Sequence, residues 1–333
     1  MSLVINSPLD MHVHLRDGEM LKNVVEYTAK YFSGALIMPN LLPPITSKEQ
    51  VQKYKKEILD VCINKNFEPY MTLFLKEELS FDFLNDIKEH ILAVKLYPSG
   101  VTTNSQTGLA SIDTEKLKGT LEAMAHFGIP LSIHGETNGF SLDREKEFMP
   151  IFEELAAKFP KLKIIMEHIS SKESISTLKK FDNLYATVTV HHLLMTLDDV
   201  IGGALKPHNF CKPILKTPKD RDAIQEAVLS GDKKIMFGSD TAPHAIDKKE
   251  SASGSAGVFS APVLLQALAS FFDKHNSLNK MQDFVSTNAK NIYNINPPKK
   301  EIILEKADFL VPNIISSVVP LFAGEILNYS IKQ

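Results

Sequence analysis

Short apolar runs recur along this chain and are separated by segments with helical periodicity. Eight of these runs predict β-strands, at 9–15, 34–39, 68–75, 91–97, 130–135, 163–169, 184–190 and 234–239. Several are apolar on both faces, which is typical of parallel strands that are buried on both sides. Between the fifth and sixth runs, Phe148, Phe152 and Leu155 fall on one stripe of a helix predicted at 144–159. The pattern therefore predicts strands and helices in alternation.

The alternation favours one fold class. Eight strand–helix units predict an α/β fold, a (β/α)8 TIM barrel with a small C-terminal extension. Helix-start signals support the helices, since Thr46 with Glu49 matches a capping box and Thr217 before Pro218 predicts an N-cap. A doubly wound open sheet is the alternative. It is disfavoured because no glycine-rich dinucleotide fingerprint follows the first strand.

Two long polar stretches interrupt the alternation, at 98–112 and 241–259. Long loops inside a compact domain are usually functional. The tail from Pro297 predicts a strand pair around Ile302–Val311. A chain of 333 residues is long for one domain, but α/β barrels often reach this length. We therefore expect a single barrel domain over 1–333, with the tail, about 297–333, packed on the barrel.

Composition and charge exclude several classes of protein. Hydrophobic residues make up 44% of the chain and charged residues 23%, which is enough apolar material for a large core and excludes intrinsic disorder. The formal charge is −3 and no basic stripe is present, which argues against a nucleic-acid partner. No apolar run approaches the ~18 residues that span a bilayer, and the first residues lack a signal-peptide pattern. Two distant cysteines, Cys62 and Cys211, favour a reducing cytoplasm over a disulfide framework.

His12 and His14 lie two residues apart on the first predicted strand. A period of two places both imidazoles on one face, together with Asp10. The opposite face then carries Leu9, Met11, Val13 and Leu15. Two imidazoles near the C-terminal end of a strand form half of a metal site, and the alternative is a pair of hydrogen-bonded core histidines.

Three further candidate ligands stand at the ends of later strands. His134 ends the fifth strand, His168 the sixth and Asp240 the eighth. In a barrel the C-terminal ends of the strands converge on the face that carries the active site. Four histidines and one carboxylate that arrive on one face favour a metal site over isolated core histidines.

Lys95 stands inside the fourth predicted strand, in the run Ile-Leu-Ala-Val-Lys-Leu-Tyr. A buried ammonium group is unfavourable without a partner, and here it would lie beside metal ions. One interpretation is a side chain that extends past the strand end to solvent. The other is a neutral amine that has added carbon dioxide, because the resulting carbamate has two oxygens and can bridge two cations.

Five motifs together resemble the amidohydrolase superfamily and, within it, the dihydroorotases of the shorter, bacterial (class II) type. They are HVHLRDG at 12–18, LYPSGVTTNS at 96–105, FCKPILK at 210–216, GSDTAPH at 238–244 and PLFAGE at 320–325. The resemblance covers nearly the whole chain, although no motif can be matched between Asn291 and Ser316.

The resemblance implies a metal-dependent hydrolase with two Zn²⁺ per subunit. His12, His14 and Asp240 would bind the first ion, His134 and His168 the second, and N6-carboxylated Lys95 would bridge them. A zinc-bridged hydroxide would be the nucleophile, with Asp240 as general acid and base. The implied reaction is the reversible interconversion of N-carbamoyl-L-aspartate and (S)-dihydroorotate in de novo pyrimidine biosynthesis. A cytoplasmic homodimer is also implied, with a small-molecule substrate and no nucleic-acid or membrane partner.

The resemblance also assigns substrate contacts. Arg16, Asn40 and His244 would hold the substrate carboxylate. The backbones of Ala256 and Leu215 would contact the ring, and Thr102 and Thr103 would close over it from a mobile loop at 98–108. From the residues alone, the preferred interpretations are a turn residue for Asn40 and a solvent-facing loop histidine for His244. His191, His192 and both cysteines are expected to be structural.

Two rival functions remain at this point. Another cyclic amidase, such as a hydantoinase or allantoinase, would share the metal ligands but has no reason to combine Arg16, Asn40 and His244. A catalytically inactive barrel that serves as a scaffold would be expected to have lost a ligand or the proton-transfer carboxylate. All six of those positions are intact here.

Overall fold

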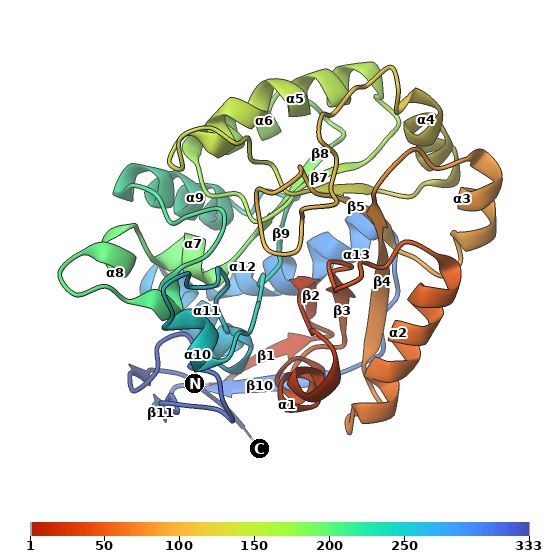
Figure 1. Cartoon of the computed structure of the whole chain (residues 1–333). Coiled ribbons are helices and arrows are strands. Elements are labelled where there is room, and N and C mark those ends of the chain that lie inside the picture. The colour runs from red at the N-terminus through yellow and green to blue at the C-terminus, as the bar shows by residue number, and fades with distance from the viewer. Residues whose placement is uncertain (1, 333) are drawn as a thin grey trace.

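The computed structural model describes residues 2–332, and its centre is a barrel of parallel strands (Figure 1). Eight strands lie in the order β2-β3-β4-β5-β6-β7-β8-β9, and every neighbouring pair is parallel. Their bounds are Leu9–Val13, Gly34–Ile37, Glu68–Leu75, Ala93–Leu96, Leu131–Ile133, Ile164–Met166, Leu184–Val188 and Ile235–Phe237. Each expected strand run contains one of them, and the predicted (β/α)8 barrel is confirmed.

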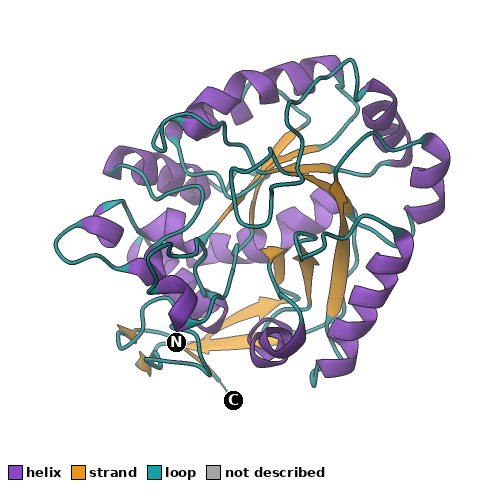
Figure 2. Ribbon diagram, viewed as in Figure 1, coloured by secondary structure: helices purple, strands orange, loops and turns teal. Residues whose placement is uncertain are grey.

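Helices surround the strands on the outside (Figure 2). The α-helices are α1 Gly18–Ala29, α2 Lys48–Val61, α3 Phe81–Ile87, α4 Lys118–Phe127, α5 Arg144–Lys158, α6 Lys172–Leu178, α7 Val190–Leu194, α8 Asp198–Ile201, α9 Pro218–Ser230, α10 Ile246–Lys249, α11 Leu264–Lys274, α12 Leu278–Gln282 and α13 Asn288–Tyr293. Three further short helices are not α-helical: η1 Pro207–Asn209, η2 Ala261–Val263 and η3 Asp283–Thr287. No helix within residues 2–332 is long and apolar enough to cross a membrane.

Two helix starts test the capping signals. Thr217 caps α9 and forms a capping box with Asp220, as the sequence predicts. The box at α2 lies one residue later than predicted. The Ser47 side chain accepts a hydrogen bond from the Gln50 backbone, and the Gln50 side chain accepts one from the Ser47 backbone. The predicted pairing of Thr46 with Glu49 is therefore wrong.

The N-terminal half of the barrel interior is filled by an apolar cluster from five of its strands. It contains Leu9, Met11, Leu36, Met38, Ala93, Ile165 and Met236. Helix α13 contributes Ala289, Ile292 and Tyr293 to the same cluster and so closes this end of the barrel. A larger cluster fills the layer between the strands and the surrounding helices. Polar site residues are thereby confined to the opposite, C-terminal mouth.

Strand β2 does not alternate regularly. Leu9 and Met11 pack in the interior cluster, whereas Val13 and Leu15 pack in the outer layer. The expectation that all four share one face is wrong, because the pairing of β2 with β3 shifts register between Asp10 and Val13. An irregularity of this kind re-aims the side chains that follow it. Here it lets apolar residues fill the base of the barrel while His12 still faces inward above them.

The barrel closes between its first and last strands through single contacts rather than a continuous ladder. The Asp240 backbone donates to the His12 carbonyl at 2.8 Å, and the His14 backbone donates to the Thr241 carbonyl at 3.0 Å. The Asp10 carboxylate accepts from the Ser239 backbone at 2.7 Å. The residues that close the barrel are therefore the candidate site residues or their neighbours.

The tail forms two small sheets outside the barrel. Strand β10 (Glu301–Glu305) lies between β1 (Ser2–Asn6) and β13 (Ser330–Ile331), and both pairs are antiparallel. Strand β11 (Phe309–Leu310) pairs with β12 (Ile326–Leu327). The predicted strands near Ile302–Val311 exist, but the prediction that they pair with each other is wrong. Strand β10 pairs instead with β1, which is longer than β11.

One buried ion pair connects three segments around the barrel. Glu145 on α5 and Lys216 lie 3.3 Å apart with side chains only 4% and 3% exposed. Glu145 also accepts hydrogen bonds from Ser170 and Ser174. Burial alone would raise the pKa of Glu145, but Lys216 and these donors hold it below its ordinary value.

We expect Glu145→Leu to lower the free energy of unfolding by about 3–5 kcal/mol, because Lys216 would remain buried without a charged partner. The double variant Glu145→Leu/Lys216→Met should recover much of this loss. Since the folded-state pKa of Glu145 is depressed, the wild-type advantage should be complete above the ordinary value of 4.5 and shrink as the pH falls below it. Urea unfolding at several pH values measures both effects.

Asp60→Asn is the matched control, since it removes an exposed ion pair with Lys56. It should change stability far less. A Glu145→Leu variant as stable as the wild type at neutral pH would contradict this account.

Candidate metal centre

The C-terminal ends of the strands bring the predicted ligands to one cavity. His12, His14, His134, His168 and Asp240 all line it, although they come from four separate strand ends. The full lining is His12, His14, Arg16, Asn40, Tyr97, Thr102, Thr103, His134, His168, Lys212, Asp240, Ala242, Ala256 and Gly257. The convergence that the barrel topology predicts is thus present in the structure.

Asp240 faces both histidines of the first strand. Its Oδ1 lies 3.0 Å from His14 Nε2 and 3.5 Å from His12 Nε2. These three side chains form a group whose donor atoms all lie within 4.8 Å of one another. Burial alone would raise the pKa of Asp240, but the interaction with His14 and the other nearby histidines holds it well below its ordinary value. Burial lowers the pKa of His14 to about 4. Near neutral pH the group therefore offers the Asp240 carboxylate and the neutral imidazole of His14.

His134 and His168 form the second part of the cavity wall. His134 Nδ1 lies 3.1 Å from His168 Nε2, and both rings are buried. The other ring nitrogen of His134, Nε2, donates to Glu136 at 2.8 Å. Because the His134 proton is on Nε2, where it bonds to Glu136, Nδ1 presents its lone pair toward His168. Burial lowers the pKa of both histidines, so both rings are neutral, and His168 Nε2 is the nitrogen that can donate to His134 Nδ1.

A carboxylate behind His12 fixes the orientation of its ring. His12 Nδ1 donates to Glu167 Oε2 at 2.8 Å, and the same oxygen accepts from Thr187 Oγ1 at 2.6 Å. This leaves His12 Nε2 as the nitrogen that points into the cavity. The sequence analysis did not single out Glu167 or Glu136. The available signal was a glutamate inside each histidine motif, MEH and HGE, next to a buried strand.

Lys95 is completely buried, and its Nζ has no hydrogen-bond partner in residues 2–332. The amine lies 5.0 Å from the centre of the Tyr97 ring. Burial lowers the pKa of Lys95 to about 8, against the opposing effect of Glu167 and Asp240. The interpretation in which Lys95 extends to solvent is therefore wrong. A buried polar atom without a partner is rare in native proteins and calls for a group not yet placed.

Three site residues adopt a backbone conformation that is unusual for residues with side chains. Arg16, His168 and Asp240 have positive φ angles of 60°, 39° and 47°. Each follows the end of a barrel strand. Such residues are strained and persist only where the surrounding structure fixes them, most often at functional sites. The left-handed turn lets each side chain leave the strand direction and face the cavity.

Asn40 has a structural contact that its motif did not suggest. Its Oδ1 accepts from His14 Nδ1 at 2.8 Å, and its Nδ2 donates to the Thr103 carbonyl at 3.0 Å. Asn40 therefore orients a candidate ligand and links it to the loop after β5. It is not merely a turn residue.

Arg16 and His244 lie side by side at the cavity. Arg16 Nη2 is 3.0 Å from His244 Nε2, and Arg16 Nε donates to the Pro243 carbonyl at 3.2 Å. His244 Nε2 is also 3.0 Å from the Ala256 carbonyl, so this nitrogen can serve only one of its two neighbours at a time. Burial lowers the pKa of His244 to about 3, so its ring is neutral. None of these contacts neutralises the Arg16 charge, and the pair can accept an anionic group.

The remaining predicted contacts divide into two groups. Thr102, Thr103 and Ala256 line the cavity, and Thr103 Oγ1 donates to the Ala256 carbonyl at 3.3 Å. Leu215 is fully buried and is not among the lining residues. Lys212, three positions earlier in the same motif, lines the cavity instead and was not singled out from the sequence.

These observations meet the requirements of a metal site. Imidazole and carboxylate donors suit zinc and similar divalent ions. Hydrogen-bonded carboxylates stand behind two of the rings, as they do behind most metal-binding histidines. The unpaired amine of Lys95 lies among the same residues, where a carbamate would add two oxygen donors.

The chain resembles known proteins over its whole length. Residues 4–300 match the model of the Amidohydrolase family. A dihydroorotase of Helicobacter hepaticus is 45% identical, over 100% of this chain and 98% of its own length. The crystal structure of a dihydroorotase from Campylobacter jejuni superimposes with a TM-score of 0.95 at 47% identity, covering 100% of this chain and 98% of the other. Dihydroorotase from Saccharomyces cerevisiae in complex with 5-fluoroorotic acid gives 0.93 at 33% identity, covering 99% and 98%.

We expect Glu167→Gln to weaken metal binding about 10- to 100-fold, because the amide supports the His12 ring less strongly than the carboxylate does. Titration of the metal-depleted protein with zinc, followed by elemental analysis, measures this. Glu173→Gln is the control, since Glu173 lies on α6 away from the cavity lining and should leave zinc affinity unchanged. Equal affinity of the Glu167 variant and the wild type would show that this carboxylate does not support a metal ligand.

Proposed function

The chain belongs to the amidohydrolase family and, within it, to the dihydroorotases, and from this premise we propose that it interconverts N-carbamoyl-L-aspartate and (S)-dihydroorotate. The observation that carries the proposal is the combination of a metal-type donor set with a free cation, Arg16, in one cavity. A cyclic amide needs activation of water and a proton donor for the leaving nitrogen, and its carboxylate needs a cation. The reaction is a step of de novo pyrimidine biosynthesis.

We propose that the cavity holds two Zn²⁺ ions. His12, His14 and Asp240 would hold one, His134 and His168 the other, and Lys95 would join them as its N6-carboxylate. Bound zinc supplies Lewis acidity and lowers the pKa of a coordinated water molecule to about 7. The burial that lowers the pKa of Lys95 supports the carbamate, because only the neutral amine adds carbon dioxide and the product leaves no ammonium charge beside the ions.

Asp240 is the residue proposed to move the proton. Its Oδ1 faces the two histidines, so Oδ2 is the oxygen left to exchange a proton with water. The carboxylate would take a proton from the attacking water and deliver it to the ring nitrogen as the amide bond breaks. In the ring-closing direction the same oxygen would remove the proton from that nitrogen.

Arg16, Asn40 and His244 are proposed to bind the substrate carboxylate. Arg16 can turn from the neutral His244 ring to a carboxylate without breaking an ion pair, since its present partners are uncharged. His244 Nε2 would then donate to the carboxylate or stay with Ala256. One N–H of the Asn40 amide bonds to the Thr103 carbonyl and the second can donate to the carboxylate, which links binding to the loop.

Thr102 and Thr103 are proposed to cover the bound substrate. The segment 98–108 starts three residues after Lys95, and its two threonines line the cavity. Ala256 is placed to contact the ring through its backbone. For Leu215 the support is weaker, because the neighbouring residue that lines the cavity is Lys212.

The rival cyclic amidases, hydantoinase and allantoinase, act on rings for which the Arg16–His244 pair has no role. A catalytically inactive scaffold is disfavoured because the four histidines and Asp240 all line the cavity. A direct assay of ring opening with dihydroorotate and with hydantoin separates these functions. Activity toward hydantoin but not dihydroorotate would overturn the proposal.

We also propose one hydrolase domain over 1–333, with the tail from about 297 packed on the barrel, because Leu304, Val318 and Leu321 share the main buried cluster. A homodimer is proposed from family resemblance and from the prevalence of twofold oligomers. The two free, buried cysteines support a reducing, cytoplasmic location. Sedimentation equilibrium tests the dimer.

Asp240→Asn should lower kcat by about 100-fold or more while KM changes little, because the amide cannot accept the proton. Steady-state kinetics in both directions measures this, and elemental analysis shows how much metal the variant retains. Asp247→Asn changes an exposed carboxylate nearby and should behave like the wild type. If the Asp240 variant keeps its metal and a nearly normal kcat, the assigned proton transfer does not occur there.

Arg16→Met should lower kcat/KM for dihydroorotate by an amount equivalent to about 2–5 kcal/mol, as loss of a buried charged partner does. The loss should be much smaller for the same ring without its carboxylate. Comparing the two substrates under identical metal loading isolates the carboxylate contact. Equal losses would instead indicate that Arg16 supports the cavity wall through Pro243.

A further inference from the structure

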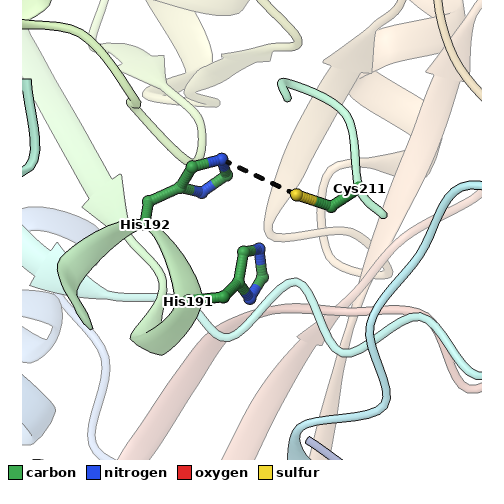
Figure 3. Close-up of side chains that lie close together, drawn as sticks. All are labelled: His191, His192 and Cys211. Carbon is green, nitrogen blue, oxygen red and sulfur yellow. Dashed lines mark hydrogen bonds between the residues drawn. The ribbon is translucent and has the colours of Figure 1, made fainter. Parts of the chain in front are cut away.

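A second group of donor atoms lies outside the cavity lining. His191 and His192 stand on α7, and Cys211 stands on the segment between η1 and α9 (Figure 3). One ligand atom from each lies within 4.8 Å of the others, and all three residues are buried. His192 Nε2 and Cys211 Sγ are 4.0 Å apart. None of the three lines the candidate metal centre.

The His191 ring is unusual for a core residue. It is completely buried, and neither Nδ1 nor Nε2 has a hydrogen-bond partner in the described part of the chain. A buried polar side chain without partners is unfavourable by roughly 1–3 kcal/mol, and each such group calls for an explanation. Burial also holds the pKa of His191 well below its ordinary value, so at least one ring nitrogen keeps a free lone pair.

The His192 ring is already held in place from behind. Its Nδ1 lies 2.9 Å from Thr189 Oγ1, and its Nε2 lies 2.9 Å from the Pro213 carbonyl. The Cys211 thiol donates to the same carbonyl at 3.2 Å. A hydroxyl can donate to Nδ1 or accept from it, so Thr189 supports either tautomer of the ring. With the proton on Nδ1, Nε2 is free to bind a cation.

We propose that His191, His192 and Cys211 form a second metal site, for a thiophilic ion such as Zn²⁺ or Cu⁺. On binding, Cys211 loses its thiol proton to solvent as the metal–sulfur bond forms. The His192 ring proton is then on Nδ1 instead of Nε2, and this N–H donates a hydrogen bond to Thr189 Oγ1. The Pro213 carbonyl, released from both donors, is the nearest candidate for a fourth ligand. No oxidation or reduction is involved.

The donors need only small movements to reach bonding distance. Bonds of about 2.3 Å to sulfur and about 2.0 Å to nitrogen place tetrahedral donors roughly 3.3–3.6 Å apart. His191 is free to turn because no hydrogen bond holds its ring. One thiolate neutralises a monovalent ion completely and a divalent ion by half, and Lys249 is a nearby cation that opposes further positive charge. Zn²⁺ and Cu⁺ are therefore tested in separate experiments.

Such an ion would fasten α7 to the segment that carries Lys212. Cys211 directly precedes Lys212, which lines the candidate metal centre. The bound ion would hold this part of the cavity wall in place from outside the cavity. It would be a structural clamp, and it does not depend on the proposed reaction.

X-ray absorption spectroscopy tests the site directly. The donors of the candidate metal centre are nitrogen and oxygen, so any metal–sulfur path reports a cysteine. The metal-depleted full chain is loaded with Zn²⁺ or, without oxygen, with Cu⁺. We expect a sulfur path at about 2.3 Å in the wild type for at least one ion. Cys211→Ser should lose this path and bind one ion fewer per chain.

Cys62→Ser is the matched control, since Cys62 is also free and buried but belongs to no group of candidate metal ligands among the described residues. It should keep the sulfur path. His191→Phe is a second variant, chosen because it removes two buried nitrogens that have no hydrogen-bond partner among the described residues. It should therefore fold at least as stably as the wild type. It should nevertheless lower affinity for the ion at least 10-fold. No sulfur path with either ion, or a path that survives in Cys211→Ser, would overturn the proposal.

Discussion

Closure of the barrel between β2 and β9 is the constraint on which the site depends. The two strands share no continuous ladder, and the contacts that join them involve the backbones of His12, His14 and Asp240. The same short segments therefore complete the fold and carry the donors. A change that loosened this seam between β2 and β9 would separate His12 from Asp240 before it affected the rest of the barrel. Positive φ angles on either side of the cavity fit this tight coupling of fold and site.

Burial determines the chemistry that this seam can support. The cavity donors are buried, and burial keeps the imidazoles of His14, His134 and His168 neutral while Asp240 stays ionised through its histidine contacts. Carboxylates placed one layer farther out, on Glu136 and Glu167, fix which nitrogen of each ring faces inward. A cation brought into the cavity would meet oriented lone pairs with little rearrangement. Preorganisation of this kind is what separates a metal site from a collection of buried histidines.

The sequence predicted the fold and the inward donors well because both follow short periods. Short apolar runs separated by helical segments, repeated eight times, leave few topologies open, and strand ends in a barrel converge by construction. Contacts that depend on side-chain direction were harder to predict from the sequence. The register shift after Asp10 broke the expected alternation in β2. Glu167, Lys212 and the neighbourhood of Cys211 with His191 became visible only once distant segments were placed together, because no local pattern encodes such contacts.

The sheet outside the barrel joins the two ends of the chain, since β1 pairs with β10 and β10 with β13. During synthesis on the ribosome, β1 (Ser2–Asn6) cannot pair until β10 (Glu301–Glu305) has been made. The seam likewise cannot form until β9 has emerged, and until then β2 presents an unpaired edge. The nascent chain therefore spends most of its translation with its earliest strands unfinished. Chaperones that bind exposed strand edges would find their longest opportunity at its N-terminus.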